Sequence, residues 1–169
     1  MPHQNPEEVF EDRYTSLFTQ RFVGRGTKVT YDRDRAATDL GYHLLAPGTL
    51  EHLQVKVWFQ LKGIHRETLG RREAEDASFV TVRVAVRDLL FWQAGPEATY
   101  LVVYIESLDE FVAEDVRDIV GRQWPEGGLR AALDGQQSIG VRVSRTAVLT
   151  DERIAAMTKH RSMRIDGPA

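Results

Sequence analysis

Gln60 and Lys62 bring two chemically useful polar groups to one face of an extended segment. Residues 55–63 read Val-Lys-Val-Trp-Phe-Gln-Leu-Lys-Gly, and their apolar and polar residues alternate as in a half-buried β-strand. Successive side chains of a strand point to opposite faces, so Gln60 and Lys62 emerge together, about 7 Å apart at ~3.3 Å per residue. Upstream, Asp39 lies at an expected turn into another strand.

These residue types suit phosphodiester hydrolysis with a divalent cation. Such a site needs hard oxygen ligands that converge on one point and a cationic group near the attacking water or the scissile phosphate. Asp39 supplies a carboxylate, Gln60 an amide oxygen, and the backbone carbonyl of Leu61 is a further candidate ligand. Lys62 can orient the water, lower its pKa or stabilise developing negative charge. The alternative is an ordinary solvated strand face, because Gln-x-Lys is a common pattern on exposed strands.

Periodic segments surround this strand and must position it. Phe10, Tyr14, Leu17, Phe18 and Phe22 recur at helical spacing, which predicts a helix from about Pro6 to Phe22. The central strand is expected from about His52 to Lys62, with Gly63 breaking it. Residues 64–77 are highly charged and predict a mobile excursion. Further strands are expected near 27–31, 42–45, 79–84, 99–105 and 137–143, and further helices near 87–93, 112–120, 129–133 and 150–160.

Length and composition limit the classes of protein to which this chain can belong. A chain of 169 residues is expected to form a single domain, here a mixed α/β domain with helices packed on a mixed central sheet. The absence of cysteine excludes disulfides, thiolate metal sites and a cysteine nucleophile. No apolar run is long enough to span a membrane, and the polar, acidic start is unlike a secretory signal, so a cytoplasmic protein is expected. The net charge of −3 argues against strong non-specific binding to nucleic acid.

Several motifs in order along the chain resemble those of a known group of nucleases. The runs are DRYTSLFTQRFVG, TDLGYHLL, VKVWFQLKG and VAVRDLLFWQAGPEATYLVVY. They resemble the PD-(D/E)xK superfamily, which has the restriction-endonuclease-like fold, and its Mrr-like branch with Gln before x-Lys. They are also similar to a bacterial domain-of-unknown-function family numbered 4365, which carries Asp-x-Gly, Gln-Leu-Lys, a Leu-x-x-Trp helix and a Pro-led apolar strand. The resemblance covers roughly residues 6–145.

The resemblance implies a fold and an activity. The fold is an α/β core of a helix, a three-stranded meander, a helix and a further strand. The activity is that of an endonuclease using Mg²⁺ or Mn²⁺ in bacterial antiviral defence against foreign DNA, with double-stranded DNA as the expected partner. Asp39, Gln60 and Lys62 become the catalytic residues, and Asp39, Gln60, Leu61 and Glu11 the metal ligands. Glu11 matches a carboxylate that some members carry on their first helix.

The sequence is also compatible with other functions. The neutral Gln60 and the mild acidity also suit a catalytically inactive module that binds nucleic acid or protein in a defence complex, with a protein partner or as a homo-oligomer. A plain structural subunit is the third alternative. A basic cluster of Arg21, Arg25 and Lys28, joined by Arg33 and Arg35, can meet a DNA backbone or be ordinary surface. Trp58 shares the polar face of the central strand, so it either packs under the first helix or lines the site, and packing is the expectation.

Overall fold

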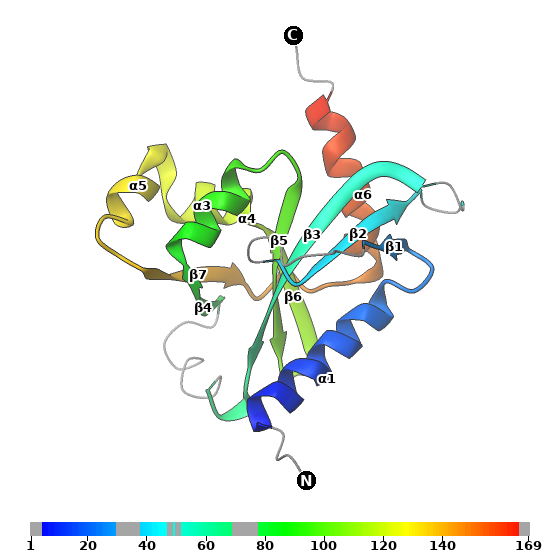
Figure 1. Cartoon of the computed structure of the whole chain (residues 1–169), viewed down its shortest axis with the longest axis horizontal. Coiled ribbons are helices and arrows are strands. Elements are labelled where there is room, and N and C mark those ends of the chain that lie inside the picture. The colour runs from blue at the N-terminus through cyan, green and yellow to red at the C-terminus, as the bar shows by residue number, and fades with distance from the viewer. Residues whose placement is uncertain (1–4, 30–37, 47–48, 50–51, 69–77, 166–169) are drawn as a thin grey trace.

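A mixed five-stranded sheet with helices on both faces forms the framework of the protein (Figure 1). The computed structural model describes residues 5–29, 38–46, 49, 52–68 and 78–165. The elements in chain order are α1 (Pro6–Arg21), β1 (Gly26–Lys28), β2 (Leu40–Leu45), β3 (His52–Ile64), β4 (Phe79–Ala85), α3 (Val86–Ala94), β5 (Ala98–Ile105), β6 (Glu110–Asp115), α4 (Val116–Gln123), a 3₁₀ turn (Pro125–Gly127), α5 (Leu129–Ala132), β7 (Ser138–Ser144) and α6 (Asp151–Ile165).

The strand order of the sheet is β1-β2-β3-β5-β6. β1, β2 and β3 form an antiparallel meander, β3 pairs in parallel with β5, and β5 pairs antiparallel with β6. β4 and β7 form a separate antiparallel pair. The predicted mixed α/β fold is therefore confirmed. The expected succession of helix, meander, helix and further strand is present in α1, β1–β3, α3 and β5.

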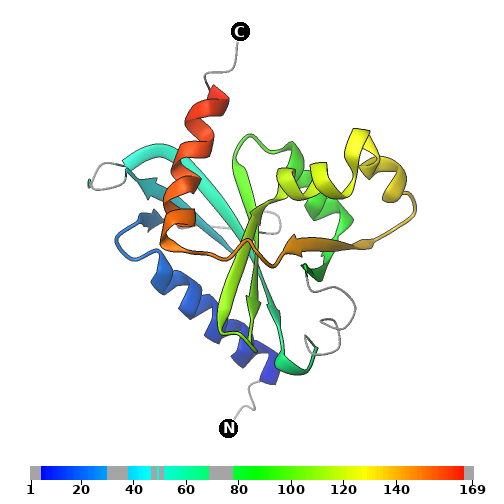
Figure 2. The ribbon, with the colours of Figure 1, turned by 180° about the vertical axis from the view of Figure 1, so that it is seen from behind.

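Two hydrophobic clusters lie on the two faces of this sheet, so the sheet lies between them. One cluster packs Val57, Phe59 and Leu61 against α1 and α6. The other cluster packs β5 and β6 residues against α3, α4 and the β4–β7 pair. Figure 2 shows α1 and α6 on one side of the sheet, with the smaller strand pair and its helices on the other. Gln60 and Lys62 alternate with the first set, so they face the side of α3 and β4.

The start of α1 follows the expected capping chemistry. The Asn5 side chain accepts a hydrogen bond from the Glu7 amide, Pro6 occupies the first turn, and Glu7 and Glu8 lie near the positive helix end. Tyr14 and Phe18 are buried on its inner side. The helix ends at Arg21, one residue before the predicted boundary.

Several predicted boundaries are wrong: β1 ends at Lys28, and α6 continues to Ile165, past its expected end near residue 160. Residues 110–115 form strand β6, and the helix predicted from Val112 begins at Val116. Both faces of β6 are covered, so the strand lacks alternation, and the four-residue spacing of Val112 and Val116 imitates a helix. Gly63 also does not end β3, which continues to Ile64.

The expected excursion over 64–77 lies largely outside the described residues. Ile64 belongs to β3, and residues 66–68 form a helical turn.

Gly63 instead lets α1 approach the sheet. A Cβ atom at this position would lie 2.6 Å from Cε1 of Tyr14 and in similar conflict with the ring of Phe10. Phe10 and Tyr14 contact each other edge to face, with centroids 5.2 Å apart. The missing side chain therefore sets the distance between α1 and β3.

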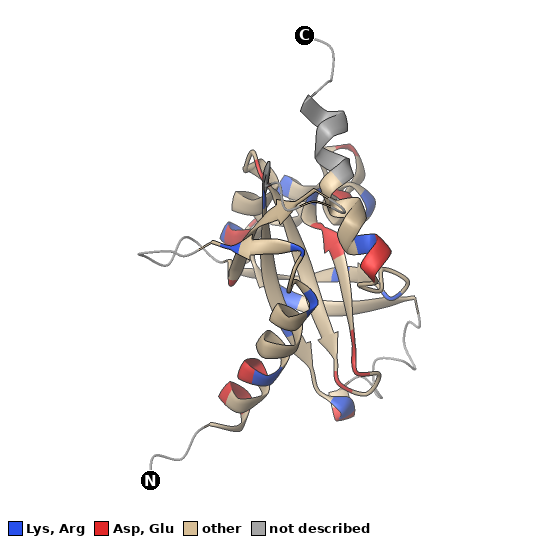
Figure 3. Cartoon of the chain, turned by 90° about the vertical axis from the view of Figure 1, so that its right-hand side faces the viewer, with Lys and Arg blue, Asp and Glu red and all other residues tan. Residues whose placement is uncertain are grey.

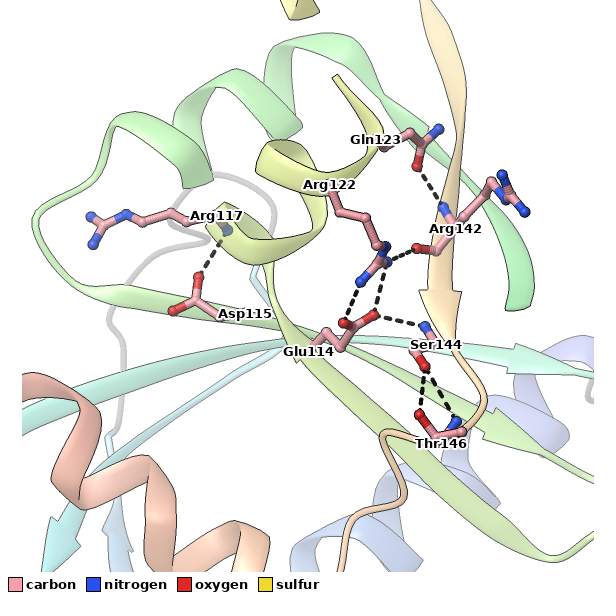
Figure 4. A network of polar contacts seen from close by, with 8 residues as sticks. All are labelled: Glu114, Asp115, Arg117, Arg122, Gln123, Arg142, Ser144 and Thr146. Atoms are coloured by element: carbon pink, nitrogen blue, oxygen red, sulfur yellow. Dashed lines mark hydrogen bonds and ion pairs between the residues drawn. The ribbon is translucent and has the colours of Figure 1, made fainter. Parts of the chain in front are cut away.

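A buried glutamate joins α4 and β7 to the main sheet. Glu114 on β6 accepts two hydrogen bonds from the Arg122 guanidinium, at 2.6 and 3.1 Å, and a third from the Ser144 amide at 2.7 Å (Figure 4). Arg122 also donates to the Arg142 carbonyl at 2.6 Å. Because these bonds reach three elements at once, we interpret Glu114 as the polar link between the two sheets.

The described surface carries both signs of charge. Figure 3 shows acidic and basic residues interspersed along α1 and around the start of α6. Arg21 and Arg25 of the predicted basic cluster are bound to α6, lying 3.3 and 3.0 Å from the Asp151 carboxylate. In the part of the chain that the structure describes, no helix is both long enough and apolar enough to cross a membrane.

The packing at Gly63 predicts the effect of adding one methyl group. Gly63→Ala forces the rings of Phe10 and Tyr14 outward, and we expect a loss of about 1–3 kcal/mol in the free energy of unfolding, as for other overpacked sites. Gly121→Ala is the control, because Gly121 lies in α4 and a Cβ atom added there would meet no atom within 4 Å. Urea unfolding compares the two, and equal stabilities would refute the tight contact.

The Glu114 network predicts that removing a buried carboxylate lowers the free energy of unfolding more than removing an exposed one. Breaking a fully buried ion pair costs about 3–5 kcal/mol, and the partial exposure of Arg122 lowers our expectation for Glu114→Ala to about 2 kcal/mol. Asp151→Ala is the matched control: its carboxylate also pairs with arginine but is 72% exposed, so about 0.5 kcal/mol is expected. Thermal unfolding measures both, and a cost for Asp151→Ala as large as that for Glu114→Ala would contradict this role.

Candidate functional site

Asp39 is anchored at the point where the chain enters β2. Its backbone amide donates to the Phe59 carbonyl at 3.0 Å, which extends the β2–β3 pairing by one residue. Its carboxylate Oδ2 accepts from the Leu61 amide at 2.7 Å and from the Gln60 side-chain amide at 2.8 Å. Residues that are 21 and 22 positions apart in sequence therefore meet at one carboxylate oxygen.

Gln60 is buried and directs its amide nitrogen toward two acceptors. Nε2 donates to Asp39 Oδ2 and, at 3.3 Å, to the Leu61 carbonyl oxygen. These two oxygens are among those proposed from the sequence as cation ligands. The Gln60 amide and the Leu61 backbone together hold the Asp39 carboxylate in place.

Lys62 lies in the same cleft as Asp39 and Gln60. The cleft has a volume of about 280 Å³ and is lined by residues of β3, the segment before β2, the end of β4, and α3. Lys62 is half-buried, and among the described residues it has no hydrogen-bond or ion-pair partner. The structure therefore brings the three predicted catalytic residues together and leaves the ammonium group of Lys62 available to an anion.

Two further charged residues of this cleft come from α3 and were not predicted. Arg87 and Asp88 lie in the first turn of the helix, directly after β4, and line the cleft opposite β3. The Arg87 guanidinium pairs with the Asp88 carboxylate at 3.2 Å, and the Arg87 side chain is 89% exposed. The sequence shows a charged pair after a strand, but nothing in it indicates that β4 folds back across the sheet to this place.

Glu11 does not line the cleft. It is an exposed residue of α1, and α1 packs on the opposite face of β3 from Gln60 and Lys62. Its charge and that of Asp39 both act on Tyr14: burial raises the pKa of the Tyr14 hydroxyl, and the two carboxylates raise this pKa further. The role of Glu11 as a metal ligand stays a prediction.

Trp58 does not pack under α1, contrary to expectation. It projects from β3 on the same face as Gln60 and lines a second, smaller cavity beside the cleft, together with Trp92 of α3. Trp58 cannot point toward α1 because it alternates with Val57 and Phe59, which already fill that side. Trp92 is buried and lines both cavities.

The donor atoms of the cleft fit a small divalent cation in type. Asp39 and Asp88 provide carboxylates, Gln60 an amide oxygen and Leu61 a backbone carbonyl, and Mg²⁺ is usually bound through one or two carboxylates while several of its waters remain. Within the described residues no group of three His, Cys, Asp or Glu side chains is arranged to hold a metal ion. A cation here would therefore depend on Asp39 and on neutral oxygens, and it would compete with the amide nitrogen of Gln60.

Comparisons with known proteins add little to this geometry. No protein-family model matches the chain, and no curated protein sequence matches it. The solved structure of D212, a nuclease from a fusselovirus, aligns over 95% of this chain and 93% of that chain, with 9% identity and a TM-score of 0.47. A likeness of this extent carries no functional conclusion, so the function must be inferred from the chain's own residues.

Proposed function

We propose that the cleft binds a divalent cation, Mg²⁺ or Mn²⁺, and hydrolyses phosphodiester bonds in nucleic acid. The observation that carries the proposal is the convergence of Asp39, Gln60 and Lys62 on one cleft, with the Asp39 carboxylate held against the β3 backbone. The proposal includes a role in bacterial defence against foreign DNA and kinship with the Mrr-like nucleases and family 4365, as the sequence motifs imply.

Each residue has a separate task in this reaction. Asp39 and the Leu61 carbonyl hold the cation, which when bound supplies Lewis-acid polarisation of the phosphate. Lys62 orients the attacking water and stabilises negative charge that develops on the phosphate oxygens. The exposed guanidinium of Arg87 binds a neighbouring phosphate. Glu11 is assigned no task here, because α1 packs on the opposite face of β3 from the cleft.

Gln60 has to rearrange for this chemistry. Its amide nitrogen now donates to both Asp39 and the Leu61 carbonyl. To serve as a ligand, Gln60 would have to turn its Oε1 toward the cation in place of these N–H groups. The present hydrogen bonds of Gln60 would therefore compete with cation binding.

The same hydrogen bonds favour a second candidate function. The Asp39 carboxylate already accepts hydrogen bonds from the Gln60 side-chain amide and the Leu61 backbone amide. A protein that stays in this state would bind nucleic acid through Lys62 and Arg87 without cutting it, or bind a protein partner in a defence complex.

Removal of the charged groups tests the catalytic proposal. We expect Lys62→Ala and Asp39→Asn each to lower the rate of cleavage by about 10²–10³-fold, the usual effect of deleting one electrostatic contact to the transition state. Asn retains an oxygen that accepts from the Leu61 amide, so the second variant should fold normally. Cleavage of labelled oligonucleotides with Mg²⁺ or Mn²⁺ is the measurement. Binding by the wild-type protein without cutting would favour the second candidate.

Gln60→Glu tests the competition between the amide and the cation. Without divalent cations the new carboxylate faces Asp39, so this variant should melt at a lower temperature than the wild-type protein. Millimolar Mn²⁺ should then raise its melting temperature more than that of the wild-type protein, because a second anionic oxygen replaces a donor. Gln136→Glu controls for added charge outside the cleft, because Gln136 is exposed and does not line the cleft. Equal Mn²⁺ shifts in all three proteins would contradict a cation site at Gln60.

A further inference from the structure

An aromatic groove adjoins the cleft and has no role in the chemistry proposed above. It is lined by Trp58 of β3, by Phe91 and Trp92 of α3, and by Pro96 and Glu97 in the connection to β5, and its volume is about 120 Å³. We call these residues the aromatic groove. The groove shares Thr38 and Trp92 with the cleft, so the two cavities are adjacent.

Trp58 is held in a fixed orientation within the groove. Its indole N–H donates to the Glu97 carboxylate. The Lys56 ammonium lies 5.1 Å from the ring centroid and 3.9 Å from the same carboxylate. A ring fixed from two sides loses little conformational entropy when a ligand stacks on it, which favours binding.

Phe91 presents the second aromatic surface. Its side chain is among the most exposed large apolar groups that the structure describes, at 57%. It lies one residue before the buried Trp92 in α3 and lines the groove from the helix side. Trp92 is also notable, because its buried indole nitrogen has no hydrogen-bond partner among the described residues.

The distribution of charge separates the tasks of the two cavities. Lys62 and Arg87 attract phosphate into the cleft, whereas the charge of Glu97 at the groove is offset by the Lys56 ammonium 3.9 Å away, so the groove does not attract phosphate. Glu97 can still accept hydrogen bonds from the N–H groups of a base edge. An apolar, ring-lined space with one carboxylate therefore suits the base of a nucleotide and not its phosphate.

We infer that the aromatic groove binds one unpaired nucleobase of the strand whose phosphate lies in the cleft. This inference rests on the proposed function and specifies its substrate class. In a duplex the bases are stacked inside the helix, and the aromatic faces are reached only after a base is unpaired and turned outward. The substrate is then a single strand, or an unpaired site within a duplex, and not the intact double-stranded DNA expected from the sequence.

Binding without cleavage tests the inference. The probe is a fluorescently labelled single strand of about eight thymidines, within the usual site sizes of such proteins, with EDTA present so that no cation is needed. An abasic strand of the same length matches its phosphates. Base–aromatic stacking is worth about 1–3 kcal/mol per base, so the thymidine strand should bind about 5-fold to 150-fold more tightly than the abasic one.

Two variants distinguish base stacking from non-specific apolar binding. Phe91→Leu keeps an apolar residue but removes the aromatic face, and it should cancel most of the preference for the base-bearing strand. Leu90→Ala is the matched control, since Leu90 is 38% exposed on the same helix and does not line the groove, and it should leave the preference intact. Both positions are exposed, so neither variant is expected to unfold the protein.

The outcomes also distinguish this inference from the proposed function. A base preference that depends on Phe91, in a protein that cuts nothing with Mg²⁺ or Mn²⁺, would support the groove and reject the nuclease. Cation-dependent cutting of intact duplex that is unaffected by Phe91→Leu would support the nuclease and overturn the groove. Equal binding of thymidine and abasic strands, tighter binding of intact duplex than of single strand, or no binding of any strand would also overturn it.

Discussion

The hydrogen bonds between Asp39 and β3 hold the candidate site together. One carboxylate oxygen accepts from the backbone of Leu61 and from the side chain of Gln60, which ties the entry of β2 to the middle of β3. The strict alternation of β3 then decides which side chains share a face with that carboxylate. Phe59 and Leu61 pack into the core under α1, and Gln60 and Lys62 line the cleft. A shift of one residue in register would exchange the two sets and remove the site.

The parallel pairing of β3 with β5 places this site in the interior of the sheet. Gln60 lies opposite Leu101 and Lys62 opposite Val103. Those two β5 residues belong to the cluster that packs against α3 and the β4–β7 pair. The polar side chains therefore emerge at the border of a hydrophobic core, where solvent is partly excluded and electrostatic contacts are stronger than at an open surface. The Glu114 network holds the second layer in place on the same side.

The central features of the fold were predictable because they depend on local pattern. The β3 alternation, the α1 capping residues and the apolar β5 segment each carry a signal within a few residues. β6 gave a misleading signal, since covering both of its faces removes the alternation that distinguishes a strand from a helix. Gly63 was misread for a related reason: its small size allows close packing against α1, and that contact comes from residues far earlier in the chain.

The site was predictable only in part. Asp39, Gln60 and Lys62 followed from residue type and order, whereas Arg87 and Asp88 required knowledge that β4 crosses the sheet face. The orientation of the Gln60 amide also depends on the three-dimensional contact with Asp39, which the sequence does not show.

A crystal structure grown with Mn²⁺ and a short oligonucleotide would decide whether the cleft is a cation-dependent catalytic site. We expect an anomalous peak within about 2.0–2.6 Å of an Asp39 carboxylate oxygen, with the Gln60 amide oxygen turned toward it and a phosphate beside Lys62. Oligonucleotide bound in the cleft with no Mn²⁺ peak, and with the Gln60 amide nitrogen still on Asp39, would contradict this assignment.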